Sequence, residues 1–427
     1  MSPGRPEPVI RADEKGRREV VDILESAIGA MMEYPRISEV LGRRSPPAHR
    51  RRRIVVVAIG KAALSMSRVA EALDAVADRA LIVVPHGHRS HWHGQVPWGA
   101  DVLEAGHPQP DQHSAAAADA VEEMVSGLSS EDRVLALISG GGTALVATPI
   151  PGISAERFRE ALDALYVGGL PIGEVNAIRR GICRLAGGGL LASAGRAQVR
   201  ALVLSDVPGD DPCTVASGPT CQLEHREQER TVELVDSFLG RSASACVKAR
   251  FESQSNRTNA VINLVGTNAD MLDAVRKECG RRSIPVATTV SIRGEARVAG
   301  KELAHTATER LSRGEAIVFG GETTVTVTGS GRGGRCQEFV IAAAAAIESE
   351  GHRAIVACVG TDGRDGPTDA AGAVAVVDPG ATRWTASAGL ALAQNDAYPL
   401  LHADGALVFT GPTHTNVMDA GLIIMAD

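Results

Sequence analysis

A run of glycines follows one of the most apolar segments of the chain. Directly after Val134–Ile138 come Ser139, Gly140, Gly141, Gly142 and Thr143. Consecutive glycines adopt backbone torsions that other residues avoid, so their N–H groups can converge on an anion at the start of the next helix. An ordinary strand-to-helix turn needs only one glycine. The segment therefore favours a site for a phosphate or a carboxylate, with a simple turn as the alternative.

Lys61 has a comparable place in the sequence. It follows the apolar run Ile54–Ile59 and Gly60, and a helical pattern begins directly after it. A lysine at the carboxyl end of a parallel strand can offset the charge of a phosphoryl group during transfer. The Walker A sequence is absent from the chain. An exposed lysine at a helix start is an equally good interpretation of this residue taken alone.

A second glycine-rich segment, Gly329–Gly334, fits the pattern Gly-x-Gly-x-x-Gly of dinucleotide-binding proteins. The pattern supports a nicotinamide-dependent reductase as a rival hypothesis. Arg332 and Arg335 lie within or next to these glycines, and arginine binds phosphate or carboxylate through two parallel hydrogen bonds. The segment therefore suits a transferring phosphate at least as well as a pyrophosphate.

Two further loops are rich in aspartate, and each follows an apolar run typical of a strand. Their aspartates are Asp206, Asp210, Asp211, Asp362, Asp365 and Asp369. One or two carboxylates at strand ends can hold Mg²⁺ together with phosphate oxygens, and one can serve as a catalytic base. Asp-Gly turns account for some of these residues, but six aspartates in two loops exceed what turns require.

A dense group of histidines comprises His86, His88, His91 and His93. Histidine is a common metal ligand, but nothing in this spacing fixes a coordination geometry. We therefore expect a surface loop here, with a metal site as the alternative.

The elements that position these residues follow from the pattern of apolar runs. Helical segments, such as 114–126 and 155–165, alternate with short β-branched runs. The strand candidates are 54–60, 80–84, 134–139, 199–204, 260–265, 316–319 and 354–359. This alternation predicts an α/β fold with parallel sheets packed between helices.

The chain of 427 residues exceeds what one apolar core usually supports, so we expect two domains. Residues 223–258 are mostly helical and polar and carry no motif, which places the boundary near residue 255. The expected domains are 15–255 and 256–427.

Composition excludes several classes of protein. The net charge of −7 opposes nonspecific binding to nucleic acid, and no apolar run is long enough to cross a membrane. We expect a cytoplasmic protein whose partners are small molecules, as a monomer or a homodimer. The seven cysteines include no Cys-x-x-Cys pair, so we expect reduced thiols and no structural zinc.

The order of these segments resembles the glycerate 2-kinase family, whose second domain is often called the MOFRL domain. The resemblance extends over roughly residues 15–425. The matching strings are Gly60–Ala63, Gly106–Pro108 with Pro110–Asp111, Ser139–Leu145, Asn176 with Arg179, Ser205–Asp211, Ser217–Thr220, Gly321–Thr324, Gly331–Glu338, Gly360–Gly372, Asn395–Asp396, and Gly411–Thr413 with Thr415–Val417.

The resemblance implies a Rossmann-like N-terminal domain, a smaller α/β C-terminal domain, an active cleft between them, and the use of ATP with Mg²⁺. It implies roles in phosphoryl transfer for Lys61 and Arg335, with Asp206 lining the cleft. In the mechanism that we expect, Asp206 is also catalytic, and Asp206 or Asp362 supports Mg²⁺ or the attacking hydroxyl. Contacts with substrate or phosphate are implied for Ser139, Gly140, Gly141, Gly142, Thr143, Asn176, Arg179, Asp211, Gly333, Gly334, Gln337, Glu338, Thr413 and Asn416. The expected reaction transfers the γ-phosphoryl group of ATP to a hydroxyl of glycerate or a related small polyhydroxylated substrate.

The chain also departs from the family pattern. Gly181, Cys183 and Ala186 stand where the family has histidine, serine and lysine. Cys336, His414 and Thr143 replace an asparagine, a glycine and a serine. The residues for phosphoryl transfer are retained, whereas the acceptor pocket is altered, so an acceptor other than glycerate is a strong alternative.

Two other hypotheses remain. The first is an NAD(P)H-dependent hydroxypyruvate reductase, although the stretch Ala354–Cys358 lacks the acidic residue that holds the ribose in a dinucleotide fold. The second is a relative that binds a metabolite without turnover. Retention of Lys61 and Arg335 argues against that reading.

Overall fold

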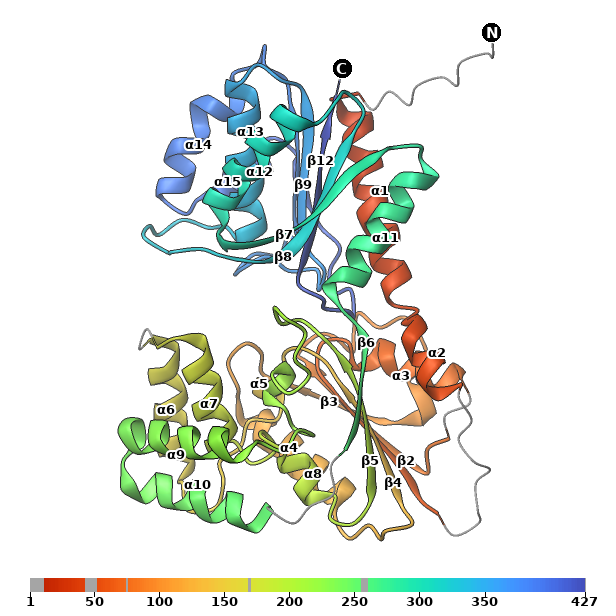
Figure 1. Ribbon diagram of the computed structural model, residues 1–427, viewed down its shortest axis with the longest axis vertical. Helices are drawn as coiled ribbons and strands as arrows, with labels where there is room; N and C mark the ends of the chain where they lie inside the picture. Colours follow the sequence, from red (N-terminus) through yellow and green to blue (C-terminus); the bar gives the residue numbers. More distant parts are fainter. Residues whose placement is uncertain (1–10, 43–51, 74–75, 168–169, 255–259, 427) are drawn as a thin grey trace. The chain divides into compact units, whose positions relative to one another are not determined.

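Figure 1 shows the chain as a computed structural model, which describes residues 11–42, 52–73, 76–167, 170–254 and 260–426. The chain forms two compact units with separate apolar cores. The N-terminal unit runs from Tyr34 to Val265. The C-terminal unit runs from Gly266 onward and also includes the described residues up to Glu33.

This division differs from the expected one. The expected boundary at 255/256 falls within 255–259, outside the described residues, and the units separate between Val265 and Gly266. The first helix, α1 (Glu14–Met31), belongs to the C-terminal unit, because it packs against α11 (Asn268–Arg281) and the sheet of that unit. Sequence order alone assigns such a helix to the domain that follows it.

The N-terminal unit is built on a six-stranded sheet. Its strands are β1 (Ile54–Ile59), β2 (Arg79–Pro85), β3 (Asp101–Ala105), β4 (Arg133–Ile138), β5 (Gln198–Leu204) and β6 (Val261–Gly266). The spatial order is β3-β2-β1-β4-β5-β6, and β1 to β5 are mutually parallel, as predicted. This is the strand order of the Rossmann fold, in which ligands bind where the order reverses, at the carboxyl ends of β1 and β4.

Helices surround this sheet and form a second small core. The helices are α2 (Pro35–Leu41), α3 (Ala63–Ala72), α4 (Gln112–Val125), α5 (Gly142–Leu145), α6 (Ala155–Val167), α7 (Ile172–Ile182), α8 (Gly189–Ser193), α9 (His225–Leu239) and α10 (Arg241–Gln254), with 3₁₀ turns at Pro97–Gly99 (η1) and Val215–Ser217 (η2). Buried residues of α6, α7, α9 and α10 make an apolar cluster separate from the core around the sheet. That cluster holds α7 beside the β4 loop.

The C-terminal unit has a mixed sheet. Its strands are β7 (Val286–Glu295), β8 (Ala316–Thr324), β9 (Ala354–Gly360), β10 (Gly372–Val377), β11 (Leu407–Val408) and β12 (Asp419–Met425), in the order β11-β10-β9-β12-β8-β7. Only the pair β7 and β8 is parallel, so the expectation of a parallel sheet is wrong here. The last strand, β12, lies between β8 and β9 and is antiparallel to both, a long-range pairing that local periodicity does not indicate.

Helices cover both faces of this second sheet. In Figure 1, α1 and α11 lie on one face, and α12 (Ala296–Arg310), α13 (Arg335–Ser349), α14 (Arg383–Ala393) and α15 (Ala397–Ala403) lie on the other. The residues Cys336–Ala344 of α13 are all buried, because this helix packs against strands on one side and α12 and α14 on the other. Its alanine run allows close approach of these neighbours.

The expectation of reduced thiols is wrong for one pair of cysteines. Cys213 and Cys221 form a disulfide in the loop after β5, with their Cα atoms 5.3 Å apart. The other five cysteines are free thiols. A disulfide between residues only eight positions apart depends on the loop turning back on itself, which their sequence spacing does not show.

None of the helices within the described ranges has the length and apolar character that crossing a membrane requires.

Candidate active site

The loops after β1 and β4 meet at the point where the strand order reverses. The backbone N–H of Lys61 donates to the carbonyl of Gly140 at 3.0 Å, and the N–H of Ala62 donates to Ser139 Oγ, also at 3.0 Å. Gly60 has a φ of +128°, and a Cβ there would overlap the Ser139 side chain. Only glycine fits this crossing. The structure thus brings together the two segments that the sequence singled out separately.

The β4 loop also contacts the loop after β5. Gly141 adopts a φ of +85° and begins the short helix α5. Thr143 Oγ1 lies 2.9 Å from Ser217 Oγ in a hydrogen bond. That bond ties the glycine loop to the segment that carries Asp206 and Asp211.

A cavity of about 280 Å³ opens beside these loops. Its lining residues are His107, Pro108, Pro110, Gly141, Thr143, Ala144, Ala147, Leu162, Arg179 and Cys183. Three of them, Gly141, Thr143 and Arg179, are among the predicted site residues. His107 had appeared only within a string shared with the family, and its place near Gly141, whose added Cβ would lie 3.0 Å from the imidazole, gives it a direct part in the wall.

Arg179 brings a guanidinium to a cavity wall that also includes the polar side chains of His107 and Thr143. Asn176, three residues earlier on α7, is half-buried, as is Arg179, and the spacing puts both on one face of the helix. Cys183 follows the end of α7, and burial raises the pKa of its thiol to about 12. The thiol therefore stays protonated at neutral pH, which excludes it as a nucleophile.

Arg250, on α10, stabilises the backbone next to this wall. Its guanidinium donates to the backbone carbonyls of Arg180, Gly181, Arg184 and Ala186. Burial lowers the pKa of Arg250 to about 10, which leaves it charged at neutral pH. Sequence reasoning missed this residue, because no local motif marks a side chain that caps carbonyls many positions away.

The aspartates after β5 have different surroundings. Asp206 is half-buried directly beyond the strand, whereas Asp211 is exposed. Asp211 accepts hydrogen bonds from the N–H of Cys213 and from Thr214 Oγ1, each at 2.9 Å. Asp211 thus shapes the loop.

In the C-terminal unit, Arg335 is held by two carboxylates. Its Nε and Nη2 donate to Asp419 at 2.6 and 2.8 Å, and its Nη1 donates to Glu322 at 2.6 Å. Burial works to lower the pKa of Arg335, but attraction to Asp419 outweighs it and raises the pKa, so the guanidinium is permanently charged. Asp419 is 1% exposed and lies at the start of β12, far along the chain from its partner, which explains why the sequence did not reveal it.

The second glycine-rich segment is occupied by the protein itself. Asn395 Oδ1 accepts the N–H groups of Thr328 and Gly329, and the carbonyl of Gln394 accepts the N–H of Gly331. A Cβ on Gly329 would overlap the backbone of Gln394. The glycines therefore permit close packing within the unit, and these contacts count against a dinucleotide-binding turn.

A buried carboxylate also occupies the start of α13. Asp365 accepts the N–H groups of Cys336 and Gln337 at 3.1 and 2.9 Å, and a Cβ on Gly334 would overlap it. Burial, with repulsion from Asp419, raises the pKa of Asp365 to about 7. The N–H groups that would receive a phosphate in a dinucleotide fold are thus bound to a side chain.

Several other predicted site residues of this unit are enclosed. Gln337 is fully buried and donates to Thr368 Oγ1 at 2.9 Å, and Glu338 accepts from Asn395 at 2.8 Å. Thr413 is half-buried and donates to the carbonyl of Thr361. Asn416 is 8% exposed.

Two further predicted residues of this unit have different surroundings. Gly333, next to Gly334 in the loop before α13, packs near Ala397. Asp362, a predicted magnesium ligand, is half-buried, and its Oδ1 accepts the N–H of Arg364 at 3.0 Å.

Comparison with known proteins places this geometry in a family. Residues 19–252 match the "Domain of unknown function (DUF4147)" and residues 315–419 match the MOFRL family. The chain is 34% identical to the D-glycerate 2-kinase of Thermotoga maritima, over 96% of this chain and 99% of that protein. The chain belongs to the glycerate 2-kinase family.

A solved structure and a second relative are also similar to this chain. A crystal structure of glycerate kinase from Thermotoga maritima superposes with a TM-score of 0.81 at 31% identity, covering 97% of this chain and all of that one. A protein of Agrobacterium vitis named as a putative hydroxypyruvate reductase is also 34% identical, over 97% of this chain and 95% of that protein. Relatives at equal identity thus carry two different names.

The structure shows which of the residues that depart from the glycerate 2-kinase pattern line the cavity. Cys183 lines the cavity. Gly181 packs against α9 and α10, where a Cβ would come within 2.8 Å of Thr231. Ala186, Cys336 and His414 are buried. Thr143, the sixth departure, also lines the cavity, so the cavity wall includes two of the six, Thr143 and Cys183.

Proposed function

We propose that this member of the glycerate 2-kinase family transfers the γ-phosphoryl group of ATP to the 2-hydroxyl of glycerate. The supporting observation is the cavity beside the β1 and β4 loops, in a chain that is similar over nearly its whole length to a D-glycerate 2-kinase. The cavity wall combines the guanidinium of Arg179, the hydroxyl of Thr143 and the imidazole of His107 with glycine backbone and apolar side chains. A small hydroxy acid needs this combination, because its carboxylate requires a cation and its hydroxyls require directional partners.

In the acceptor complex, Arg179 pairs with the carboxylate of glycerate. Thr143 Oγ1, fixed by its bond to Ser217, orients a substrate hydroxyl, and Cys183 limits the size of the acceptor. Asn176, on the same face of α7, adds an amide that hydrogen-bonds the substrate. These contacts hold the acceptor in one orientation, which is the main contribution that a kinase makes to this reaction.

In the transfer step, the acceptor oxygen forms a bond to the γ-phosphorus, and the bond from that phosphorus to the bridging oxygen of ADP breaks. The carboxylate of Asp206 accepts the hydroxyl proton. The Lys61 ammonium and backbone N–H groups of 140–143 stabilise the charge on the transferring group. In the C-terminal unit, Arg335 is kept charged and oriented by Asp419 and Glu322, which suits its guanidinium to binding a phosphate.

Magnesium fits the carboxylates that the sequence nominated. Asp206 in the N-terminal unit is half-buried just beyond a strand and would hold the ion there, because carboxylate oxygens are the ligands that Mg²⁺ prefers. Asp362 is a half-buried carboxylate of the same kind in the C-terminal unit. When bound, the ion neutralises part of the phosphate charge.

The experiment is ADP release coupled to a detection system, with Mg²⁺ and a panel of D-glycerate, L-glycerate, sugar acids and polyols. Turnover on D-glycerate supports the proposal. Turnover confined to another acceptor would change the substrate assignment and point to the departures in the cavity wall, Thr143 and Cys183, as its cause. The absence of acceptor-dependent turnover from a folded, ATP-binding protein would overturn it.

The rival activity, reduction of hydroxypyruvate with NAD(P)H, is suggested by the name of one relative and by the glycine pattern. The contacts of Gly329, Gly331 and Asp365 occupy the backbone that would bind the cofactor. Titration of the protein with NADH, followed by nucleotide fluorescence, separates the two activities. Saturable binding would revive the reductase.

We further propose that the enzyme is cytoplasmic, acts on small molecules without a nucleic-acid or membrane partner, and forms a homodimer. Size-exclusion chromatography with light scattering tests the oligomeric state.

A further inference from the structure

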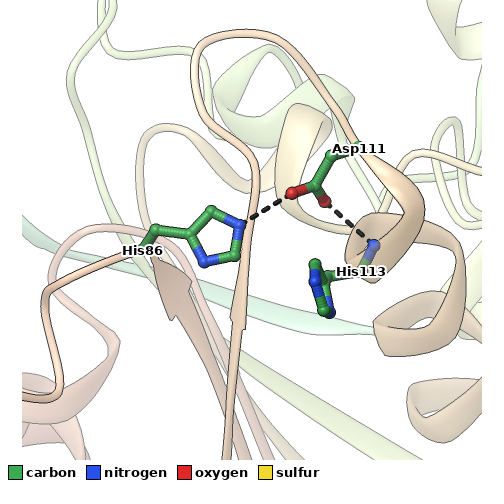
Figure 2. Close-up of side chains that lie close together, drawn as sticks. All are labelled: His86, Asp111 and His113. Carbon is green, nitrogen blue, oxygen red and sulfur yellow. Dashed lines mark hydrogen bonds and ion pairs between the residues drawn. The ribbon is translucent and has the colours of Figure 1, made fainter.

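Three side chains with metal-binding chemistry meet at one edge of the N-terminal sheet (Figure 2). His86 follows β2, Asp111 precedes α4, and His113 lies in the first turn of α4. One potential ligand atom from each lies within 4.8 Å of the other two. Within the described ranges, no other set of three histidine, cysteine or acidic side chains meets this criterion.

The carboxylate of this cluster is held in place by the backbone. Asp111 Oδ1 accepts the N–H groups of Gly106, His113 and Ser114 at 3.1, 2.9 and 3.1 Å. Those bonds fix the plane of the carboxylate and direct Oδ2 toward His86, whose Nε2 lies 2.7 Å away. Oδ2 is therefore oriented before any ion binds.

The histidines approach this oxygen from two different elements. The backbone N–H of His86 donates to the carbonyl of Ala105 at 3.1 Å, so the start of its loop is anchored to the end of β3. The imidazoles of His86 and His113 meet edge to face, with centroids 5.4 Å apart and planes at 87°. Figure 2 shows the carboxylate of Asp111 next to both rings.

Two imidazole nitrogens and one carboxylate oxygen select a particular class of ion. Mg²⁺ and Ca²⁺ prefer sites made of oxygen, whereas Zn²⁺ and its neighbours bind imidazole well. Ligand atoms around a tetrahedral Zn²⁺ lie roughly 3.3 Å apart, given Zn–N and Zn–O distances of about 2.0 Å. The present spacing brackets that value, and rotation of the exposed imidazoles closes the difference.

We propose that His86, Asp111 and His113 bind a divalent transition ion of the Zn²⁺ class, with a fourth position open to water. The ion replaces the hydrogen bond between His86 and Asp111. It is distinct from the magnesium of phosphoryl transfer in both ligand chemistry and ligand residues. Because all three side chains are exposed, the ion exchanges freely with solution.

The same ion would fix the loop before α4. His107, Pro108 and Pro110 of that loop line the cavity, and Asp111 ends it. Binding of the ion therefore stiffens one wall of the cavity without contacting the substrate.

The test is isothermal titration of the chelator-treated full chain with ZnCl₂, at pH 7.5 and with Mg²⁺ in excess. The expected result is one site in the wild type, weakened at least about tenfold by His86→Ala or His113→Ala, since even loss of an outer partner costs that much. His93→Ala is the matched control, because His93 is exposed in the same segment but outside the cluster, and it should bind as the wild type does.

Asp111→Asn gives a second, independent variant. Asparagine also caps helices well, so it preserves the bonds to the backbone while removing the anionic ligand. It should weaken Zn²⁺ binding and abolish the rise in melting temperature that Zn²⁺ causes in the wild type. Binding that is equally tight in all four variants, or no binding by the wild type at millimolar Zn²⁺, would overturn the proposal.

Discussion

The two glycine-rich loops of the molecule look alike in sequence, but they need glycine for different physical reasons. In the β4 loop, Gly141 has a φ of +85° and lines the cavity together with Arg179. In Gly329–Gly334, the glycines admit the backbone of Gln394 and the carboxylate of Asp365. Glycine permits close approach, and the approaching group can be a ligand or the protein itself.

The largest expected effect concerns the ion pair that accompanies the second loop. Asp419→Asn leaves the Arg335 guanidinium without its buried counter-charge, which should lower the free energy of unfolding by about 3–5 kcal/mol. Urea denaturation measures the change. Glu322→Gln is the matched control, because Glu322 is 36% exposed and its loss should cost less than about 1 kcal/mol. Equal losses would contradict the assignment of Asp419 as the dominant partner.

The first loop should instead respond in catalysis. Lys61→Ala removes the cation beside the β4 loop and should lower kcat for the best acceptor by about 10²–10³-fold, as the loss of one transition-state donor does. Steady-state kinetics on protein with a wild-type circular dichroism spectrum provides the measurement. Lys248→Ala, on the exposed side of α10, is the control and should leave kcat unchanged. Full activity of the Lys61 variant would remove that residue from the mechanism.

Replacing one glycine in each loop by alanine tests the difference between the two loops directly. Gly331→Ala places a Cβ against Asp396 and Gln394 and should cost about 1–3 kcal/mol of stability, with the KM for acceptor unchanged. Gly141→Ala strains a left-handed residue and presses on His107, so it should raise that KM at least about tenfold, through roughly 1–2 kcal/mol of strain in the cavity wall. If both variants changed KM equally, the two loops would not differ in role.

The last prediction is a pH dependence of stability that arises at the start of α13. The folded pKa of Asp365, about 7, lies above the ordinary value of 3.8, so the folded state binds the extra proton between these limits. Stability contributed by this group therefore falls as pH rises from about 4 to 7 and then levels off. Asp365→Asn should flatten the wild-type profile over that window in urea titrations. An unchanged slope would show that Asp365 titrates normally.

Much of the N-terminal unit could be predicted from the sequence, because it is built from local signals. The β-branched runs before Lys61 and Ser139 indicate strands that end at the same edge of a parallel sheet, and the structure brings these residues together. The histidine segment was expected on the surface, where it lies, but the partners of His86 come from the next element along the chain.

The C-terminal unit was harder to predict because its key contacts are long-range. β12 enters the sheet between two earlier strands, and only this insertion brings Asp419 to Arg335. The role of Asp365 depends in the same way on a loop that returns to the start of α13. Arg250 likewise meets carbonyls of another helix region, and no spacing along the chain records that contact.

The most direct test of the central claim is the measurement of D-glycerate-dependent ADP formation by the wild-type protein with ATP and Mg²⁺, with the product analysed by ³¹P NMR. We predict one phosphorylated glycerate for each ADP, with the phosphate on the 2-oxygen. ADP formation that is independent of D-glycerate, by a protein that binds ATP, would contradict the assignment of the cavity as a glycerate site.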